Sequence, residues 1–381
     1  MIIINQGYVS ESFNATNLIT EIEIADEKKN VIVSVEKDYG KFLSPERSDY
    51  ALLGMLGYAL RNRHDIICAA PVTDELLYKI REVFIPALVR SDSRNYPVKI
   101  QAEIAPPLDK LHVAKATRGG VGTGLSCGVD SFHAVLKHLN SDYPSQNLTH
   151  LCVYNIGSIN SCYGEENIAR VKQVVFARTS AAAAEMNMPL VKLESNFQDA
   201  VLQNHYLSHT YMDALAIYAL QKLWRIYYYA STYFVGNFSL ERNFDSDPAH
   251  FETFLLDCFS TSKLKIFSEA CQVDRNDKIN FIADSPLAQK YLHVCTRLET
   301  NCGVCEKCLR TLLAIDAANK LDNFKAAFDI DTYNKNRVNA YLFLFNQFVL
   351  RNNELYAATY QVLYQRYKDF FDSIKVQLEK N

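Results

Sequence analysis

The chain has 381 residues, of which 49% are apolar, 22% charged and 12% aromatic. This composition excludes disordered, collagen-like and fibrous chains, and the length is enough for roughly two or three domains. Forty basic and 43 acidic residues leave a formal net charge of −3, which argues against binding to nucleic acid over a broad basic surface.

The ten cysteines are too few in so long a chain for a disulfide scaffold. The first residues, MIIINQ, lack the basic region and the small-residue cleavage site of a secretory signal. The most apolar stretch, residues 211–238, contains Asp213, Lys222 and Arg225 and therefore does not fit a membrane-spanning helix. We expect a cytoplasmic protein with reduced thiols and no membrane contact.

The first part of the chain predicts a mixed α/β unit, which we assign to residues 1–115. Its apolar pattern predicts strands at 2–4, 18–24, 31–35 and 98–104 and helices at 50–60 and 75–89. Pro106 and Pro107 then interrupt the pattern.

After this break, short apolar strands alternate with long helices, which is typical of βαβ units and a parallel sheet. We expect strands at 151–156, 190–193, 233–235 and 264–267 and helices at 132–139 and 166–186. Residues 116–316 should thus form a parallel-sheet α/β domain, followed by a helical C-terminal region, 317–381. The aromatic stripe of that region, from Tyr356 to Ile374, is typical of a helix packed in a core or at the seam of a homodimer.

Residues 119–131 read GGVGTGLSCGVDS and run directly into an amphipathic helical pattern. A strand, small residues and a helix start form an anion site, because unpaired N–H groups and the positive helix end point at one place. A Walker A loop is excluded, since Leu125 and Ser126 stand where Lys-Ser/Thr is needed. A dinucleotide fingerprint is excluded because Leu125 or Cys127 occupies the position of its third glycine.

The last six residues of this segment resemble the SGGxDS loop of the PP-loop ATP pyrophosphatases: Ser126, Cys127, Gly128, Val129, Asp130 and Ser131. That superfamily cleaves ATP between the α- and β-phosphates and adenylates a substrate. The resemblance implies an adenine nucleotide alpha hydrolase-like (HUP-like) fold, in which this loop follows the first strand and holds the pyrophosphate end of ATP.

Ser126 and Ser131 would offer hydroxyl donors to phosphate, and Gly128 would allow close approach of the backbone. Asp130 suits either a Mg²⁺ ion or fixing of the loop at the helix start. Cys127 replaces the first glycine of the family loop, at a position where freedom at positive φ matters. The alternative is a serine-rich N-cap that only starts a helix.

A second motif, C-x6-C-x2-C-x2-C, consists of Cys295, Cys302, Cys305 and Cys308. Thiolates at this spacing converge on one ion, and four of them complete a tetrahedral all-sulfur shell that suits Zn²⁺. Because four cysteines would occupy all four coordination positions of the ion, we expect a closed, structural zinc site. Reduced core cysteines and an iron–sulfur cluster are the alternatives. Ordinary small apolar roles are expected for Cys68, Cys152, Cys258 and Cys271, while Cys162 is open to either role.

A PP-loop followed by four cysteines and a leucine-rich helix resembles the 7-cyano-7-deazaguanine synthases of the queuosine pathway. Those enzymes carry a structural zinc and use ATP to convert a carboxylate on a 7-deazaguanine into an amide and then a nitrile. They place a lysine segment shortly before the first zinc cysteine, where Arg275 and Lys278 stand here. The resemblance implies that both bind ATP or the adenylate, with Lys278, Asp130 and Ser131 as catalytic residues. A solvated charged turn is the alternative.

The resemblance covers roughly half of the chain, residues 116–316. The aromatic-Gly-Gln signature of the family is absent after the second strand, where residues 154–158 read YNIGS. His205 and His209, four residues apart, are expected as core or surface histidines rather than ligands. Similar synthase-like proteins with extra domains occur in bacterial antiphage operons, which implies attachment of a deazaguanine to a protein partner.

We therefore expect an ATP-dependent ligase that uses ATP, Mg²⁺ and Zn²⁺ and activates a small-molecule carboxylate for amide, nitrile or conjugate formation. Two alternatives remain open. RNA thiolation by a PP-loop enzyme would call for a basic RNA-binding domain and a reactive cysteine pair. A non-catalytic nucleotide-binding subunit would use the flanking regions to dock on a larger assembly.

Overall fold

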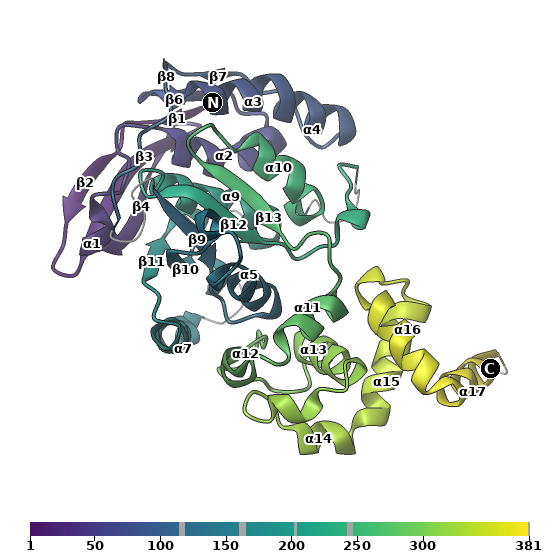
Figure 1. Cartoon of the computed structure of the whole chain (residues 1–381). Helices are drawn as coiled ribbons and strands as arrows, with labels where there is room; N and C mark the ends of the chain where they lie inside the picture. The colour runs from purple at the N-terminus through teal and green to yellow at the C-terminus, as the bar shows by residue number, and fades with distance from the viewer. Residues whose placement is uncertain (114–118, 160–164, 202–203, 242–246, 380–381) are drawn as a thin grey trace. The chain divides into compact units, whose positions relative to one another are not determined.

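The computed structural model describes residues 1–113, 119–159, 165–201, 204–241 and 247–379 (Figure 1). Residue contacts divide the chain into two compact units. Unit 1 comprises Met1–Leu125 and Ala134–Cys271, and unit 2 comprises Ser126–His133 and Gln272–Asn381. The division cuts through one helix, α5 (Val129–Leu139), whose first turn belongs to unit 2.

Among the described residues, unit 1 contains an 11-stranded sheet in the order β13-β12-β9-β10-β11-β4-β3-β1-β5-β7, with β2 paired to β3 (Figure 1). The strands are β1 (Ile2–Ile4), β2 (Tyr8–Glu11), β3 (Ala15–Ile24), β4 (Glu27–Glu36), β5 (Ile66–Cys68), β7 (Ile100–Gln101), β9 (Gly120–Gly124), β10 (His150–Asn155), β11 (Leu190–Ser195), β12 (Trp224–Ala230) and β13 (Lys265–Glu269). A separate two-stranded sheet pairs β6 (Val72–Thr73) with β8 (Ile104–Ala105).

The strands from β9 to β13 are mutually parallel and lie in the order β11-β10-β9-β12-β13. The first of them, β9, lies in the middle: the chain builds β10 and β11 on one side and β12 and β13 on the other. This is a doubly wound arrangement with its topological switch between β9 and β12, and open sheets of this kind bind ligands beyond the carboxyl ends of the strands at the switch. The expected α/β class with a large, mostly parallel sheet is confirmed.

The helices of unit 1 flank these strands in the chain. They are α1 (Lys37–Gly40), α2 (Asp49–Asn62), α3 (Asp74–Lys79), a π-helical segment (Ile80–Phe84), α4 (Ile85–Ser91), α7 (Glu165–Glu185), α8 (Phe197–Val201), α9 (His205–Ala219) and α10 (Glu252–Cys258), with 3₁₀ turns at Pro144–Gln146, Val235–Asn237 and Pro248–Phe251. The buried core of the unit joins apolar residues of the sheet to those of α2 and α9. Among the described helices, none has both the length and the apolar character needed to cross a membrane.

Three local expectations differ from the structure. Residues 233–235 are not a strand, because β12 ends at Ala230 and Val235 begins a 3₁₀ turn whose N–H donates to the Cys271 carbonyl, 2.6 Å away. Residues 98–104 contain parts of two short strands in separate sheets, and the helix expected at 75–89 forms as three consecutive segments. In each of these three segments, the run of apolar residues continues beyond the residue at which the pattern of backbone hydrogen bonds changes.

Strand β9 is not among the expected strands, because glycine has a low strand propensity and Val121 is the one apolar side chain in its sequence, GVGTG. The structure explains why glycine stands in this strand. A Cβ atom at Gly122 would lie 2.7 Å from the ring of Trp224, which is fully buried on the neighbouring strand β12. The large side chain of β12 thus occupies the space that β9 leaves empty.

Unit 2 is helical (Figure 1). After the first turn of α5 it contains α11 (Arg275–Ile282), α12 (Pro286–Tyr291), α13 (Glu306–Ala317), α14 (Ile330–Lys335), α15 (Arg337–Phe345), a π-helical segment (Asn346–Leu350), α16 (Ala357–Arg366) and α17 (Lys368–Glu379), with 3₁₀ turns at Leu321–Phe324 and Glu354–Tyr356. Tyr360 and Phe371 of the aromatic stripe are buried, with ring centroids 5.1 Å apart. The stripe therefore packs in the core of unit 2, and the expected helical C-terminal region is confirmed.

The predicted domain ranges 1–115, 116–316 and 317–381 stay a prediction, and the two units of the structure have other boundaries. Strands of the first two ranges share one sheet, because Val35 of β4 pairs antiparallel with Leu193 of β11. Helices on both sides of residue 317 belong to unit 2.

The close approach of Trp224 to β9 predicts a sharp difference between two glycines of that strand. Gly122→Ala should destabilise the protein by roughly 1–3 kcal/mol, because the added methyl group overpacks against a buried indole. Gly124→Ala is the matched control, since a Cβ atom there meets only the Tyr227 hydroxyl at 3.9 Å. Urea unfolding followed by tryptophan fluorescence measures both, and equal stabilities would contradict this packing.

Candidate functional site: an anion loop and a four-cysteine cluster

Residues 126–131, here called the SCGVDS loop, follow β9 in the chain and begin helix α5. Their own side chains close the turn. Ser126 Oγ accepts the Gly128 N–H at 3.2 Å and donates to Ser131 Oγ at 3.2 Å, and Ser131 Oγ donates to the Gly128 carbonyl at 3.0 Å. The loop is thus preformed at the positive end of an α-helix, a location that favours anions.

Cys127 has a left-handed backbone with φ of 62°, at the position where the family loop has glycine. For a residue with a side chain this conformation costs roughly 1–2 kcal/mol, so the surroundings must hold it in place. The thiol is fully buried, and the Cys127 carbonyl accepts a hydrogen bond from the His293 N–H at 2.9 Å. The loop therefore keeps the glycine-like conformation despite the substitution.

Asp130 is the meeting point of the residues predicted from two distant segments. Lys278 Nζ lies 2.9 Å from Asp130 Oδ1, and a terminal nitrogen of Arg275 lies 3.1 Å from Oδ2. The second terminal nitrogen of Arg275 donates to Thr311 Oγ1 on α13 at 3.1 Å. The Lys278 side chain is only 2% exposed, so a solvated charged turn does not describe this segment.

The charges of this cluster and burial shift the pKa values of Asp130 and Arg275. Burial alone would raise the pKa of Asp130, but the positive charges of Lys278 and Arg275 outweigh it and hold that pKa below its usual value. Burial lowers the pKa of Arg275 to about 10, with the nearby Arg310 acting in the same direction and Asp130 opposing it. Each oxygen of Asp130 accepts a hydrogen bond from a cation, so this carboxylate fixes the loop.

Several positive charges gather at this loop. Three cations, Lys278, Arg275 and Arg310, face the carboxylates of Asp130 and Glu306, and Glu306 accepts the Tyr356 hydroxyl at 3.1 Å. The buried Nε–H groups of Arg275 and Arg310 have no hydrogen-bond acceptor among the residues that the structure describes. Orphaned, positively charged donors beside a helix start are what an incoming anion would satisfy.

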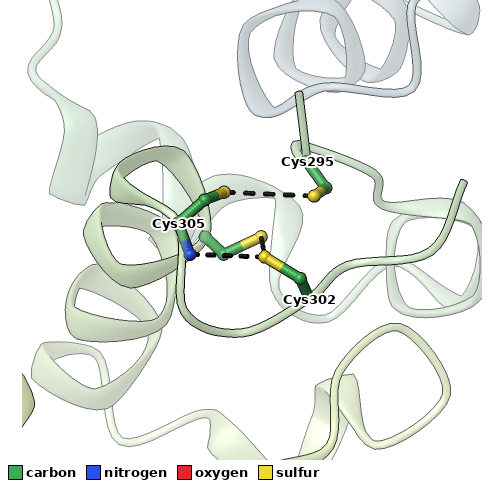
Figure 2. Close-up of side chains that lie close together, drawn as sticks. Cys295, Cys302 and Cys305 are labelled. Atoms are coloured by element: carbon green, nitrogen blue, oxygen red, sulfur yellow. Dashed lines mark hydrogen bonds between the residues drawn. The ribbon is translucent and has the colours of Figure 1, made fainter. Parts of the chain in front are cut away.

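The four cysteines of the second motif, here called the four-cysteine cluster, converge as predicted (Figure 2). Their sulfur atoms all lie within 4.8 Å of one another, with 3.9 Å between Cys302 and Cys308 and 3.9 Å between Cys295 and Cys305. Four sulfurs at the usual Zn–S distance are about 3.8 Å apart in a tetrahedron, and a disulfide needs about 2.05 Å. The four-cysteine cluster fits a zinc ion and does not fit disulfide bonds.

The backbone around the four-cysteine cluster is arranged to stabilise thiolates. The N–H groups of Arg297 and Leu298 point at Cys295 Sγ from 3.4 and 3.3 Å, and the Cys305 N–H points at Cys302 Sγ from 3.3 Å. Gly303 has φ of 72° and open space where a Cβ would stand, so it makes the tight turn between two ligands without strain. A zinc ion held by these four thiolates would have no open position, which suits a structural role.

Sequence reasoning missed several charged and polar groups. In unit 2 it passed over Thr311, although Thr311 stands one helical turn after Cys308 and therefore on the same face of α13. In unit 1, His209 is more than a plain core or surface residue, because its ring bonds Asp247 at 2.8 Å and the Tyr229 hydroxyl at 3.1 Å. Burial lowers the pKa of His209, but Asp247 outweighs it and leaves that pKa raised.

The remaining cysteines divide as expected where the structure describes them. Cys68, Cys152 and Cys258 are buried, and Cys271 is half-buried. Cys162 lies outside the described residues.

No protein-family model, no curated protein and no solved structure matches this chain. The functional interpretation therefore depends on the residues and contacts described above.

The four-cysteine cluster predicts about one tightly bound zinc ion per chain. Cys308→Ser should release the metal and lower the melting temperature of the protein, because structural zinc sites contribute folding free energy directly. Cys258→Ser is the control: that cysteine is buried in unit 1 outside the cluster, so zinc content should stay at the wild-type level. Elemental analysis after dialysis measures the metal, and zinc retained in full by Cys308→Ser would refute the assignment.

The left-handed backbone at Cys127 predicts that a glycine variant is more stable than an alanine variant, which is the reverse of their order at ordinary helical positions. Cys127→Gly and Cys127→Ala both remove the buried thiol, and only glycine relieves the positive φ. The glycine variant should be more stable than the alanine variant by about 1 kcal/mol, whereas alanine is the more stable residue at ordinary helical positions. Chemical denaturation compares them, and an alanine variant of equal or greater stability would show that the loop is not strained.

Proposed function

We propose that the protein is an ATP-dependent adenylating enzyme that activates a carboxylate and releases pyrophosphate. The observation that carries the proposal is the meeting of Lys278 and Arg275 at Asp130, within the SCGVDS loop. The resemblance to the PP-loop synthases singles out the same three residues, and the ion pair of Lys278 with Asp130 joins segments 148 residues apart in the sequence.

Three further observations support a polyphosphate ligand. The loop begins an 11-residue helix, whose free N–H groups favour an anion. Three cations, Lys278, Arg275 and Arg310, lie around Asp130, and the Nε–H groups of Arg275 and Arg310 lack an acceptor among the described residues. The loop also follows strand β9 directly in the chain, as the phosphate-binding loop of the resembling family follows its first strand.

In the proposed reaction, Ser126, Ser131 and backbone N–H groups of the loop hold the β- and γ-phosphates of ATP. A substrate carboxylate oxygen attacks the α-phosphorus, and the bond to the β-phosphate oxygen breaks, which yields an acyl adenylate and pyrophosphate. Lys278 and Arg275 stabilise the negative charge that develops on the leaving pyrophosphate. An amine then attacks the acyl carbon, loses a proton and expels AMP, so that an amide forms.

Mg²⁺ bound to the phosphate oxygens would supply further charge neutralisation. Asp130 contributes by holding the two cations at the loop. The substrate that the family resemblance favours is a deazaguanine-like carboxylate, with a protein partner as one amine acceptor. Zinc in the four-cysteine cluster has no place in these bond changes, because four thiolates leave it no open position.

Pyrophosphate exchange into ATP in the presence of candidate carboxylates, together with AMP release, tests the proposal. Ser131→Ala and Lys278→Met should each reduce turnover by roughly 10²–10³-fold, the usual loss when one stabilising donor is removed from a developing charge. Lys320→Met is the matched control, because Lys320 makes an ion pair with Asp284 in the same unit but on the protein surface. Its turnover should equal that of the wild type.

Binding measurements separate the alternatives without a known substrate. Equilibrium titration with ATP and with inorganic pyrophosphate should show binding to the wild type and to Lys320→Met, and weak binding to Lys278→Met. Wild-type turnover in both Ser131→Ala and Lys278→Met would refute the proposed site. Tight ATP binding without AMP formation for any carboxylate would instead favour a non-catalytic nucleotide-binding subunit.

A further inference from the structure

Two paths of contact lead from the four-cysteine cluster to the SCGVDS loop, and both lie within unit 2. The first path runs through the segment before the first ligand. Cys295 follows His293 by two residues, and the His293 N–H donates to the Cys127 carbonyl at 2.9 Å. The Asn301 side chain fixes this segment, because it accepts the Cys295 N–H at 3.2 Å and donates to the Leu292 carbonyl at 2.8 Å.

The second path runs through α13. Cys308 is a ligand on this helix, and Thr311 stands one turn later. Thr311 Oγ1 accepts a hydrogen bond from Arg275 at 3.1 Å, and the other terminal nitrogen of Arg275 lies 3.1 Å from Asp130 Oδ2. The side chain of Thr311 is completely buried, so no water competes for its oxygen.

The two paths end on different parts of the loop, the carbonyl of Cys127 and the carboxylate of Asp130. Gly128 and Val129 lie between these two points, at the start of α5. Because Cys127 holds a left-handed conformation that costs free energy, the loop needs restraint from outside to stay in this shape. The four-cysteine cluster is the place where both restraints originate.

We propose that zinc binding at the four-cysteine cluster positions the SCGVDS loop, so that metal and anion binding are thermodynamically linked. Without the metal, four buried or half-buried thiol groups have no reason to converge, and the turn at Cys302–Cys308 loses its anchor. Thr311 then acts as a positioning residue: it never touches the anion and transmits the restraint to Arg275. The inference rests on the proposed role of the loop as an anion site.

The experiment uses inorganic pyrophosphate as the probe and the full chain in zinc-loaded and zinc-stripped forms. Calorimetric titration should show roughly tenfold weaker pyrophosphate binding to the stripped protein, within the 5–150-fold range usual for coupled sites. Linkage requires that saturating pyrophosphate tighten zinc by the same factor. Competition with a chromophoric chelator measures this second quantity, and Lys278→Met, run in parallel, corrects for direct chelation of zinc by pyrophosphate.

Three threonine variants locate the path. Thr311→Val keeps the shape of the side chain but removes the acceptor for Arg275. It should retain zinc, and the logarithm of the ratio between its pyrophosphate dissociation constants without and with zinc should fall to half of the wild-type value or less. Thr311→Ser keeps the hydroxyl group, so its ratio should equal that of the wild type. Thr359→Val is the control, since Thr359 is also buried and bonds Asn276 on the same helix α11, but not a cation.

The outcomes are distinct. Pyrophosphate affinity that is equal with and without zinc would overturn the linkage and leave the proposed anion site intact, whereas no pyrophosphate binding in either form would overturn the proposed function. Identical losses in Thr311→Val and Thr359→Val would show that general packing of α11 carries the effect, which contradicts a path through Thr311. If zinc removal unfolds the protein, the chelator competition decides the question: saturating pyrophosphate should tighten zinc binding in the wild type and in Thr311→Ser, and less in Thr311→Val, and an unchanged zinc affinity in all three would overturn the linkage.

Discussion

The contact of Asp130 with the buried Lys278 and with Arg275 is the interaction that holds the SCGVDS loop within unit 2. Removing one partner of such a pair leaves an uncompensated charge in the interior and typically costs about 3–5 kcal/mol. Yet a pair of this kind is an inefficient source of stability, because apolar residues of similar volume often hold a fold together equally well. Cations kept beside a preformed loop agree with the proposed anion site, since an anion would meet charges whose desolvation has already been offset by Asp130.

This contact also explains why the chain tolerates a strained residue at Cys127. The carbonyl of Cys127 is held by the His293 N–H, and Asp130, three residues later, is held by two side chains of α11. With both points fixed, the backbone between them has few other conformations available, and a positive φ costs less than breaking either contact. The glycine of the resembling family loop would remove that strain but would also leave the space of the buried thiol empty.

Local sequence patterns predicted the parts of the fold that depend on neighbouring residues. The cysteine spacing predicted a cluster that the structure confirms, because two x2 turns bring three thiols together without help from distant segments. Alternating apolar residues located β1, β3, β4, β10, β11 and β13 and parts of β7 and β8, but they missed β2, β5, β6, β9 and β12. The glycines of β9 reflect the bulk of Trp224 on another strand. The same patterns wrongly extended strand character to residues 233–235, since an apolar side chain packs in a loop as readily as in a sheet.

The candidate site shows the corresponding limit for function. Spacing alone gives no reason to connect Asp130 with Lys278, and only the family resemblance suggested that both belong to one site. Thr311 belonged to no motif, because its role comes from the direction that α13 takes after the four-cysteine cluster. The continuous sheet sets a further condition: β4 pairs with β11, so residues 1–36 cover an edge that the parallel strands would otherwise leave open. The region outside the resemblance is therefore part of the folding unit that carries β9, and a shortened chain that lacks it would expose that edge directly beside the parallel half of the sheet.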